Sequence, residues 1–279
     1  MVTDRKTLLD ILGVISPAVS KREIIIQQTH AIFTGKEVCG INGNVLFRHP
    51  FPSDFKGSVK FTDIQKLLAS SKAEAVNIDV VEGKFCIKGS DVKAKLNSVI
   101  DEKDKVESQI DLMVQEMVDW KLLPEDFADA LYMTAFSASR NMTEGVITAV
   151  FVEDMHITTT DKNRASWYQM KSGVGDNFLL AASDALLVSG YELAEYCYSD
   201  RWIHFKTPQG ATFSARKLAG SFLPIRQQFE GMKTQGALNL PDYLVEAVGA
   251  ASIMVENASS DPSQVIRVLL EPGVMKPIS

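Results

Sequence analysis

Apolar positions along the chain follow two alternating periods. In some segments they recur three and four residues apart, which places them on one face of a helix. Helix-start residues accompany these segments: Thr62-Asp63, Ser183-Asp184, and the prolines Pro124 and Pro241, which suit a first helical turn. The helical period therefore predicts helices whose apolar faces run through 8–15, 64–68, 127–135 and 244–251, with another beginning near 183.

Between these segments the period changes to two, which is typical of strands with one buried face. Residues 75–81 and 84–89 flank Glu82-Gly83, a dipeptide suited to a hairpin turn. The same pattern predicts strands at 146–152 and 155–160, and at 196–198, 201–205 and 211–215. Helices combined with antiparallel hairpins indicate the α+β class.

One helix and its strands recur about every sixty residues, a fixed period that indicates a repeat architecture. Copies begin near residues 57, 118, 176 and 236, and another opens the chain at 5–12. One unit alone leaves apolar surface exposed, so we expect the units to pair into domains of ordinary size. The predicted domains are 1–117, 118–228 and a partial third at 229–279, connected through 101–117 and 225–234.

Composition narrows the functional classes. The 279 residues carry a net charge of −6, which argues against a surface that coats nucleic acid but permits a local basic face. No apolar run approaches the ~20 residues of a membrane helix. Cys39, Cys86 and Cys197 are an odd, widely spaced set, so we expect a cytoplasmic protein without a disulfide framework.

The sequence offers no catalytic or metal-binding motif. His30, His49, His156 and His204 lack metal-ligand spacing. The segment 171–176 contains glycines but lacks the order of a phosphate-binding loop, and Ser221 is not in a nucleophile elbow. We therefore expect no catalytic residue, no metal site and no cofactor.

Two segments carry a family resemblance. Residues 144–164, ending Ile157-Thr158-Thr159-Thr160-Asp161-Lys162-Asn163-Arg164, resemble a strand–turn–strand ending in Ala-Thr-Asp-Gly-x-Arg. Residues 214–224, which contain Leu218-Ala219-Gly220-Ser221-Phe222-Leu223-Pro224, resemble a "leucine, two residues, Gly-x-Phe-Pro" segment. Together with the paired repeats, they resemble the bacterial-type DNA sliding clamp, the beta subunit of the replicative polymerase. Lys162 stands where the family has glycine, Ala165 replaces a larger apolar residue, and the proline is shifted by one position.

The resemblance implies a processivity factor that encircles duplex DNA and tethers DNA polymerase and the clamp loader through short linear peptides. It implies a homo-oligomeric ring closed head-to-tail, with no membrane association. The family chain has six half-domain units and this sequence contains five, so we expect an incomplete third domain. Ring closure therefore depends on how that domain is completed.

The family's site positions carry over as two groups. The positions expected to face DNA are Arg5, Lys6, Lys21, Arg22, Lys66, Lys72 and Arg140. The positions expected to form the partner-peptide pocket are Ile147, Thr160, Lys162, Asn163, Arg164, Ala165, Leu223 and Pro224. The alternatives are that the cations are ordinary surface charges, that Ile147 and Ala165 are core, and that Arg164 is a structural ion-pair partner. Glu125, Asp126 and Asp129 at the start of the third helix would repel phosphate.

Two other functions stay open at this point. A clamp-fold scaffold would bind proteins without encircling DNA, and its helix-covered face would be neutral or acidic. An α+β enzyme would need clustered titratable groups, and the sequence offers none together.

Overall fold

The computed structural model describes residues 1–22, 27–99, 110, 115–232, 241–250, 267–271 and 274–278. The chain divides into two compact units, Met1–Glu230 and Gly231–Ser279. Each combines helix with antiparallel strands, which confirms the predicted α+β class. No helix among the described residues has the length and apolar character needed to cross a membrane.

The first half of unit Met1–Glu230 contains two helices that pack together, α1 (Arg5–Ile15) and α2 (Phe61–Ser70). Asp4 begins α1 by accepting a hydrogen bond from the Thr7 N–H at 2.7 Å, which satisfies one free amide of the first turn. A short 3-10 helix, η1 (Ser16–Ala18), follows α1. The strands are β1 (Val2–Asp4), β2 (His30–Phe33), β3 (Glu37–Ile41), β4 (Val45–Pro50), β5 (Gly57–Lys60), β6 (Ala75–Val81), β7 (Lys84–Lys88) and β8 (Lys93–Val99).

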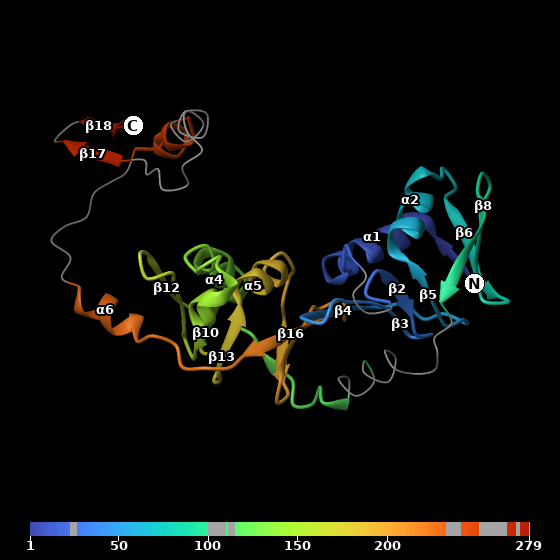
Figure 1. Ribbon diagram of the computed structural model, residues 1–279, viewed down its shortest axis with the longest axis horizontal. Helices are drawn as coiled ribbons and strands as arrows, with labels where there is room; N and C mark the ends of the chain where they lie inside the picture. The colour runs from blue at the N-terminus through green and yellow to red at the C-terminus, as the bar shows by residue number, and fades with distance from the viewer. Residues whose placement is uncertain are drawn as a thin grey trace. The chain divides into compact units, whose positions relative to one another are not determined.

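The second half repeats this arrangement with α4 (Phe127–Ala135) and α5 (Ala182–Val188), which lie together over β10 and β13 (Figure 1). A 3-10 segment, η2 (Met142–Thr148), leads into the sheet. Helix α6 (Ile225–Gly231) closes this half. The strands are β9 (Lys121–Leu122), β10 (Ala149–Glu153), β11 (His156–Thr160), β12 (Ala165–Gln169), β13 (Asn177–Ala181), β14 (Glu195–Tyr198), β15 (Trp202–Lys206) and β16 (Thr212–Leu218).

A single sixteen-stranded antiparallel sheet runs through both halves. The halves join where β4 pairs with β16, with Phe47 opposite Phe213. Both phenylalanines are fully buried, and their rings meet edge-to-face at 4.7 Å. Tyr191 packs on both rings and donates its hydroxyl hydrogen bond to the Val14 carbonyl of α1 at 3.2 Å. One core therefore spans the two halves.

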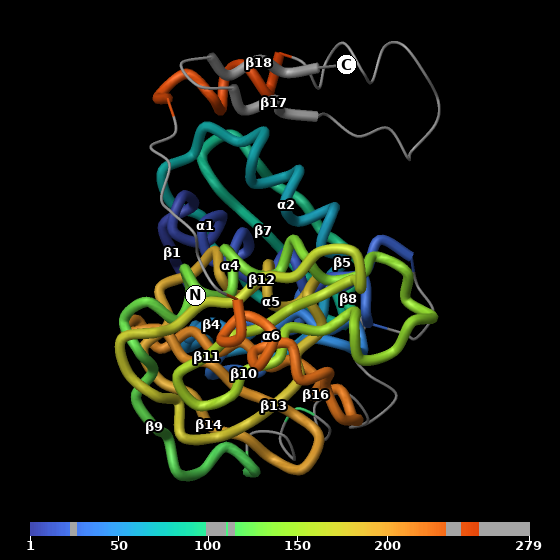
Figure 2. Tube along the Cα trace, turned by 90° about the vertical axis from the view of Figure 1, so that its left-hand side faces the viewer, coloured from blue at the N-terminus to red at the C-terminus, as the bar shows by residue number. Residues whose placement is uncertain are grey.

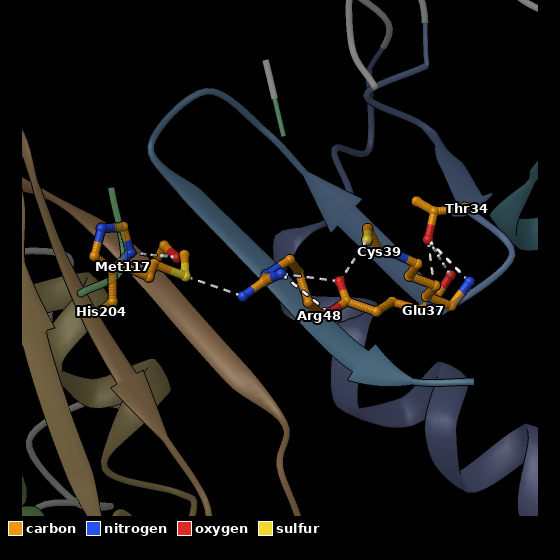
Figure 3. Close-up of polar contacts among 8 residues, drawn as sticks. Thr34, Glu37, Cys39, Arg48, Met117 and His204 are labelled. Carbon is orange, nitrogen blue, oxygen red and sulfur yellow. Dashed lines mark hydrogen bonds and ion pairs between the residues drawn. The ribbon is translucent and has the colours of Figure 1, made fainter. Parts of the chain in front are cut away.

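The opposite face of this join holds a buried polar cluster (Figure 3). Arg48 is 5% exposed and donates to both Glu37 carboxylate oxygens, at 3.0 and 3.1 Å, and to the Met117 sulfur at 3.0 Å. His204 is fully buried, and its Nδ1 lies 2.8 Å from the Ser214 hydroxyl. Burial lowers the pKa of His204 to about 4, and the nearby Arg48 cation contributes to this lowering.

The described residues of unit Gly231–Ser279 contain one helical segment, residues 244–250, and a hairpin. The hairpin pairs β17 (Arg267–Glu271) with β18 (Val274–Ile278).

The structure confirms the predicted helices and hairpins. Leu8, Leu12 and Ile15 are buried along α1, and the hairpin of β6 and β7 turns at Glu82-Gly83, both with positive φ. The predicted strand at 146–152 is wrong at its start, because residues 146–148 belong to η2 and pairing begins at β10. Gly145, with φ of 63° and ψ of −128°, interrupts the regular backbone just before them. The predicted connection at 101–117 lies mostly outside the described residues, and α6 occupies the one at 225–234.

Candidate functional site

The loop between β11 and β12, with the strand residue on either side of it, contains five of the predicted pocket positions. Thr160 ends β11 and Ala165 begins β12, so Lys162, Asn163 and Arg164 form the turn between them. The Thr160 hydroxyl donates to the Arg164 carbonyl at 2.8 Å and accepts from the Lys162 N–H at 3.0 Å. Thr160 is therefore the buried anchor of this loop.

Lys162 has a φ of 76°, in the left-handed region that glycine adopts without steric cost. A glycine at this position, as in the Ala-Thr-Asp-Gly-x-Arg segment that these residues resemble, would adopt this φ without strain. The Lys162 side chain is exposed.

Asp161 fixes the rest of the loop. One carboxylate oxygen accepts from the Asn163 and Arg164 N–H groups at 3.0 and 2.9 Å, and the other pairs with the Arg164 guanidinium at 2.9 Å. Burial alone would raise the pKa of Asp161, but these donors lower it below its usual value. Arg164 also lies 5.9 Å from the Phe136 ring centroid, so it connects the loop to the residue that follows α4. Arg164 therefore stabilises the loop, and its side chain is still 50% exposed to solvent.

A row of cross-strand neighbours runs over the sheet face opposite α4 and α5. Strand register places Trp167 opposite Thr158, Thr158 opposite Phe151, Phe151 opposite Leu179, and Leu179 opposite Leu218. The neighbouring residues of β11, Ile157 and Thr159, face the other way, and Thr159 donates to the Thr134 carbonyl of α4 at 2.6 Å. We call this row the outer row.

The segment after β16 packs along the outer row. Phe222 stacks on Phe151 with ring centroids 5.3 Å apart, and Gly220 approaches Val146 so closely that a Cβ would lie 2.5 Å from its Cγ1. Leu223 and Pro224 follow as exposed residues, while Ile147 is buried in η2 beside Val146. Of the predicted pocket positions, Ile147 and Thr160 are thus core-like, and Leu223, Pro224, Lys162, Asn163 and Arg164 are accessible.

Helix α6 covers the other end of the outer row, at Trp167. Figure 2 shows the trace of α6 in front of β10 and β11. Phe229 stacks over Trp167 at 5.9 Å, and Trp167 stacks on His156 at 5.6 Å. Arg226 pairs with Glu153 at 3.5 Å and lies 3.4 Å from the His156 Nδ1. The sequence pattern assigned this stretch to a connection and did not predict this packing. The available signal was the helical spacing of Ile225 and Phe229.

Arg5 among the predicted DNA-facing positions is engaged within the fold. Its Nε donates to the Ala73 carbonyl at 2.8 Å and its Nη1 to the Leu68 carbonyl at 3.0 Å. These carbonyls lie in and just after the last turn of α2, where a cation satisfies free acceptors. Arg5 therefore connects α1 to the end of α2.

The other predicted cations are exposed and form no ion pair with any described residue. Lys6 and Lys66 lie on the packed pair α1 and α2, Lys72 follows α2, and Arg140 follows α4. Lys21 and Arg22 follow η1. These cations therefore lie on the helices and adjoining loops.

The α4–α5 pair differs in character. Neither helix contains lysine or arginine, and their exposed positions include Tyr132, Met133 and Leu186, with Phe136 just beyond α4. Asp126 is expected from the sequence to belong to an acidic face, but it does not. It is 7% exposed and accepts a hydrogen bond from the Lys171 N–H at 3.1 Å. Glu125 and Asp129 are the remaining acidic residues at the start of α4.

Comparison with known proteins rests on the fold. The sequence matches no protein-family model and no curated protein. Solved structures match over nearly the whole chain. The DNA polymerase III subunit beta from Pseudomonas aeruginosa is 14% identical, with a TM-score of 0.73 over 99% of this chain and 79% of that one. The sliding clamp from Bacillus subtilis has 14% identity and a TM-score of 0.72 over the same shares. The beta subunit from Thermotoga maritima has 11% identity and a TM-score of 0.68 over 99% and 82%. The chain therefore has the fold of the beta sliding clamps.

Proposed function

We propose that this protein is a DNA sliding clamp, a non-enzymatic processivity factor that encircles duplex DNA and tethers replication proteins to it. The observation that carries the proposal is the agreement in fold with beta sliding clamps over 99% of the chain. The continuous sheet supports it, because β4 and β16 join the two halves by backbone pairing and helices pack on the sheet in both halves. A ring around DNA requires halves that are firmly joined in this way.

DNA contact would come from the exposed cations of the helices and adjoining loops. Lys6 and Lys66 project from packed helices, and Arg140 follows α4, each without an ion-pair partner in the described residues. Contacts of this kind reach phosphates and carry no sequence preference. Arg5 holds α2 and contributes to DNA binding mainly through its charge.

The DNA-facing assignment is tested by salt dependence. Neutralising Lys6, Lys66 and Arg140 to alanine should lower the slope of log affinity against log salt by about 0.9 for each phosphate that the variant no longer neutralises. Anisotropy of a labelled duplex measures it, and Lys88→Ala on β7 is the matched control, an exposed lysine on a strand. An unchanged slope in the triple variant would reject this face.

Partner peptides would dock beside the β11–β12 loop, near Arg164 and the exposed Leu223-Pro224. A short extended peptide with glutamine followed by alternating leucine and phenylalanine supplies apolar anchors and one polar group. Replacing Arg164 and Ile147 together should abolish its binding. Because Ile147 is buried, Arg164→Glu alone is the second variant, whose surface change leaves the core intact. Full affinity in both variants would exclude this site.

The second candidate function is a protein scaffold of the same fold. The uncharged exposed side chains of α4 and α5, Tyr132, Met133 and Leu186, favour it, because DNA phosphates gain nothing from them. The two functions differ in DNA binding. A clamp binds duplex DNA with an affinity that falls as salt rises, whereas a scaffold does not bind it.

We further propose a head-to-tail homo-oligomeric ring in the cytoplasm, loaded by a clamp loader and used by a DNA polymerase, with domains at 1–117, 118–228 and 229–279. Head-to-tail contacts form a closed ring only when the rotation between neighbouring subunits brings the last subunit back to the first. The odd, widely spaced cysteines support the location. Mass measurement in solution with the full chain tests the assembly.

A further inference from the structure

A pocket of about 640 Å³ opens at the β16 end of the outer row. Its floor is Phe151, Leu179 and Leu218, which register places side by side on β10, β13 and β16. None of the predicted peptide-pocket positions lines it. The volume falls within the range of sites that hold small ligands or short peptide segments.

Cations gather at the rim of this pocket. Arg201 and Arg216 line it, and Asp200 is the lining carboxylate. The Lys217 side chain points to the opposite face of the sheet, because it alternates with Leu218 along β16 and lies opposite Leu180. Neither arginine forms an ion pair with a described residue. Two guanidinium groups and one carboxylate give the lining a net positive charge on a chain whose net charge is −6.

The rim arginines are held in place by neighbouring groups. Arg216 lies over the Trp202 ring at 5.2 Å. The Lys217 N–H donates to the Arg201 carbonyl at 2.9 Å, which ties the β14–β15 turn to β16. Aromatic support limits the rotamer freedom of Arg216, so less entropy is lost when an anion binds.

We propose that this pocket binds a short peptide segment that carries acidic side chains beside a large apolar residue. The apolar side chain would enter over Phe151, Leu179 and Leu218, and the carboxylates would pair with Arg201 and Arg216. The site is a second docking place, separate from the β11–β12 loop, and it holds whether or not the protein encircles DNA. Charge complementarity selects the occupant, because a neutral apolar peptide leaves the net positive charge of the lining unmatched.

The test uses the full chain and a fluorescein-labelled peptide, Gly-Asp-Asp-Phe-Leu-Asp-Gly, followed by anisotropy. A matched peptide with asparagine in place of each aspartate is the ligand control. We expect the acidic peptide to bind at least about tenfold more tightly, and its affinity to fall as salt screens the charges. The double variant Arg201→Glu with Arg216→Glu should lower its affinity at least about tenfold, whereas Lys36→Glu, an exposed charge outside the pocket, should leave it unchanged.

A steric variant keeps the test valid if charge reversal disturbs the fold. Ala219 is exposed and lines the pocket, so Ala219→Trp fills it with the cations unchanged and should also abolish binding. Equal binding of the acidic and neutral peptides, full binding in Ala219→Trp, or no binding of the acidic peptide would each overturn the proposal. So would selective binding of a labelled DNA duplex at these residues in place of the peptide. A variant that no longer binds the acidic peptide but still binds the partner peptide beside Arg164 would distinguish this site from the proposed clamp function.

Discussion

The ion pair between Arg48 and Glu37 offers a quantitative test of the buried polar cluster beside the β4–β16 join. The Arg48 side chain is 6% exposed, whereas that of Glu37 is 31% exposed. Arg48 also has a buried Nε without a hydrogen-bond partner among the described residues. Removing Glu37 therefore leaves a buried cation, whereas removing Arg48 leaves a carboxylate that is partly exposed to water.

The asymmetry sets the expected magnitudes. At a separation of 3.0 Å the gross attraction is about 5 kcal/mol for an effective dielectric constant of about 20, most of it offset by desolvation. Glu37→Gln leaves a buried cation, and we expect the free energy of unfolding to fall by about 3 kcal/mol. Arg48→Met leaves a carboxylate that water can reach, so we expect a loss of about 1 kcal/mol. The double variant should be more stable than Glu37→Gln.

Urea unfolding of the full chain at neutral pH measures these differences. Tryptophan fluorescence is a suitable signal, because Trp202 lies on β15, beside the strand that pairs with β4. Unchanged m values would show that the same surface is exposed in each variant. A loss for Arg48→Met equal to or greater than that for Glu37→Gln would refute the reasoning.

Three further substitutions test individual features. Burial raises the pKa of Asp184 to about 6, so its folded-state pKa lies above the unfolded value. The free energy of unfolding should fall by about 2 kcal/mol as the pH rises from about 4 to about 6, and the loss should continue to about 3 kcal/mol above the folded-state pKa. Asp184→Asn should remove this trend in urea titrations at the two pH values. Lys162→Gly relieves a φ of 76° and should raise the free energy of unfolding by about 0.5–1 kcal/mol. Asn163→Gly, the control, should give no such increase. A loss of stability in Lys162→Gly would contradict the turn geometry. Gly220→Ala places a Cβ 2.5 Å from Val146 at a φ of 134°. The free energy of unfolding should fall by about 1–3 kcal/mol, which calorimetry measures. An unchanged melting temperature would refute this prediction.

Local patterns in the sequence predicted local structure well. Leu8, Leu12 and Ile15 form a stripe whose burial needs only the helical period, and Glu82-Gly83 prescribes its own hairpin turn. The two-residue period predicts a strand from residue 146, but Val146 and Ile147 are apolar residues that suit either state. The break at Gly145 and the hydrogen bond from the Thr148 hydroxyl to the Gly145 carbonyl at 2.7 Å decide for the 3-10 turn.

Long-range pairing could not be predicted in the same way. β4 and β16 are separated by more than half the chain, and no local period specifies that Phe47 lies opposite Phe213. The same holds for the outer row, whose pocket depends on the register of several strands. Arg5 illustrates the limit for charges, because a sequence gives its sign and not the carbonyls that it meets.

The most direct test of the sliding clamp is its retention on DNA of different topology. The full chain is loaded onto a nicked circular plasmid with a clamp loader and freed of unbound protein by gel filtration at elevated salt. Encirclement predicts that the protein stays with the circle and is lost once a restriction enzyme linearises it, because free ends let a ring slide off. Equal loss from circular and linear DNA would contradict the account.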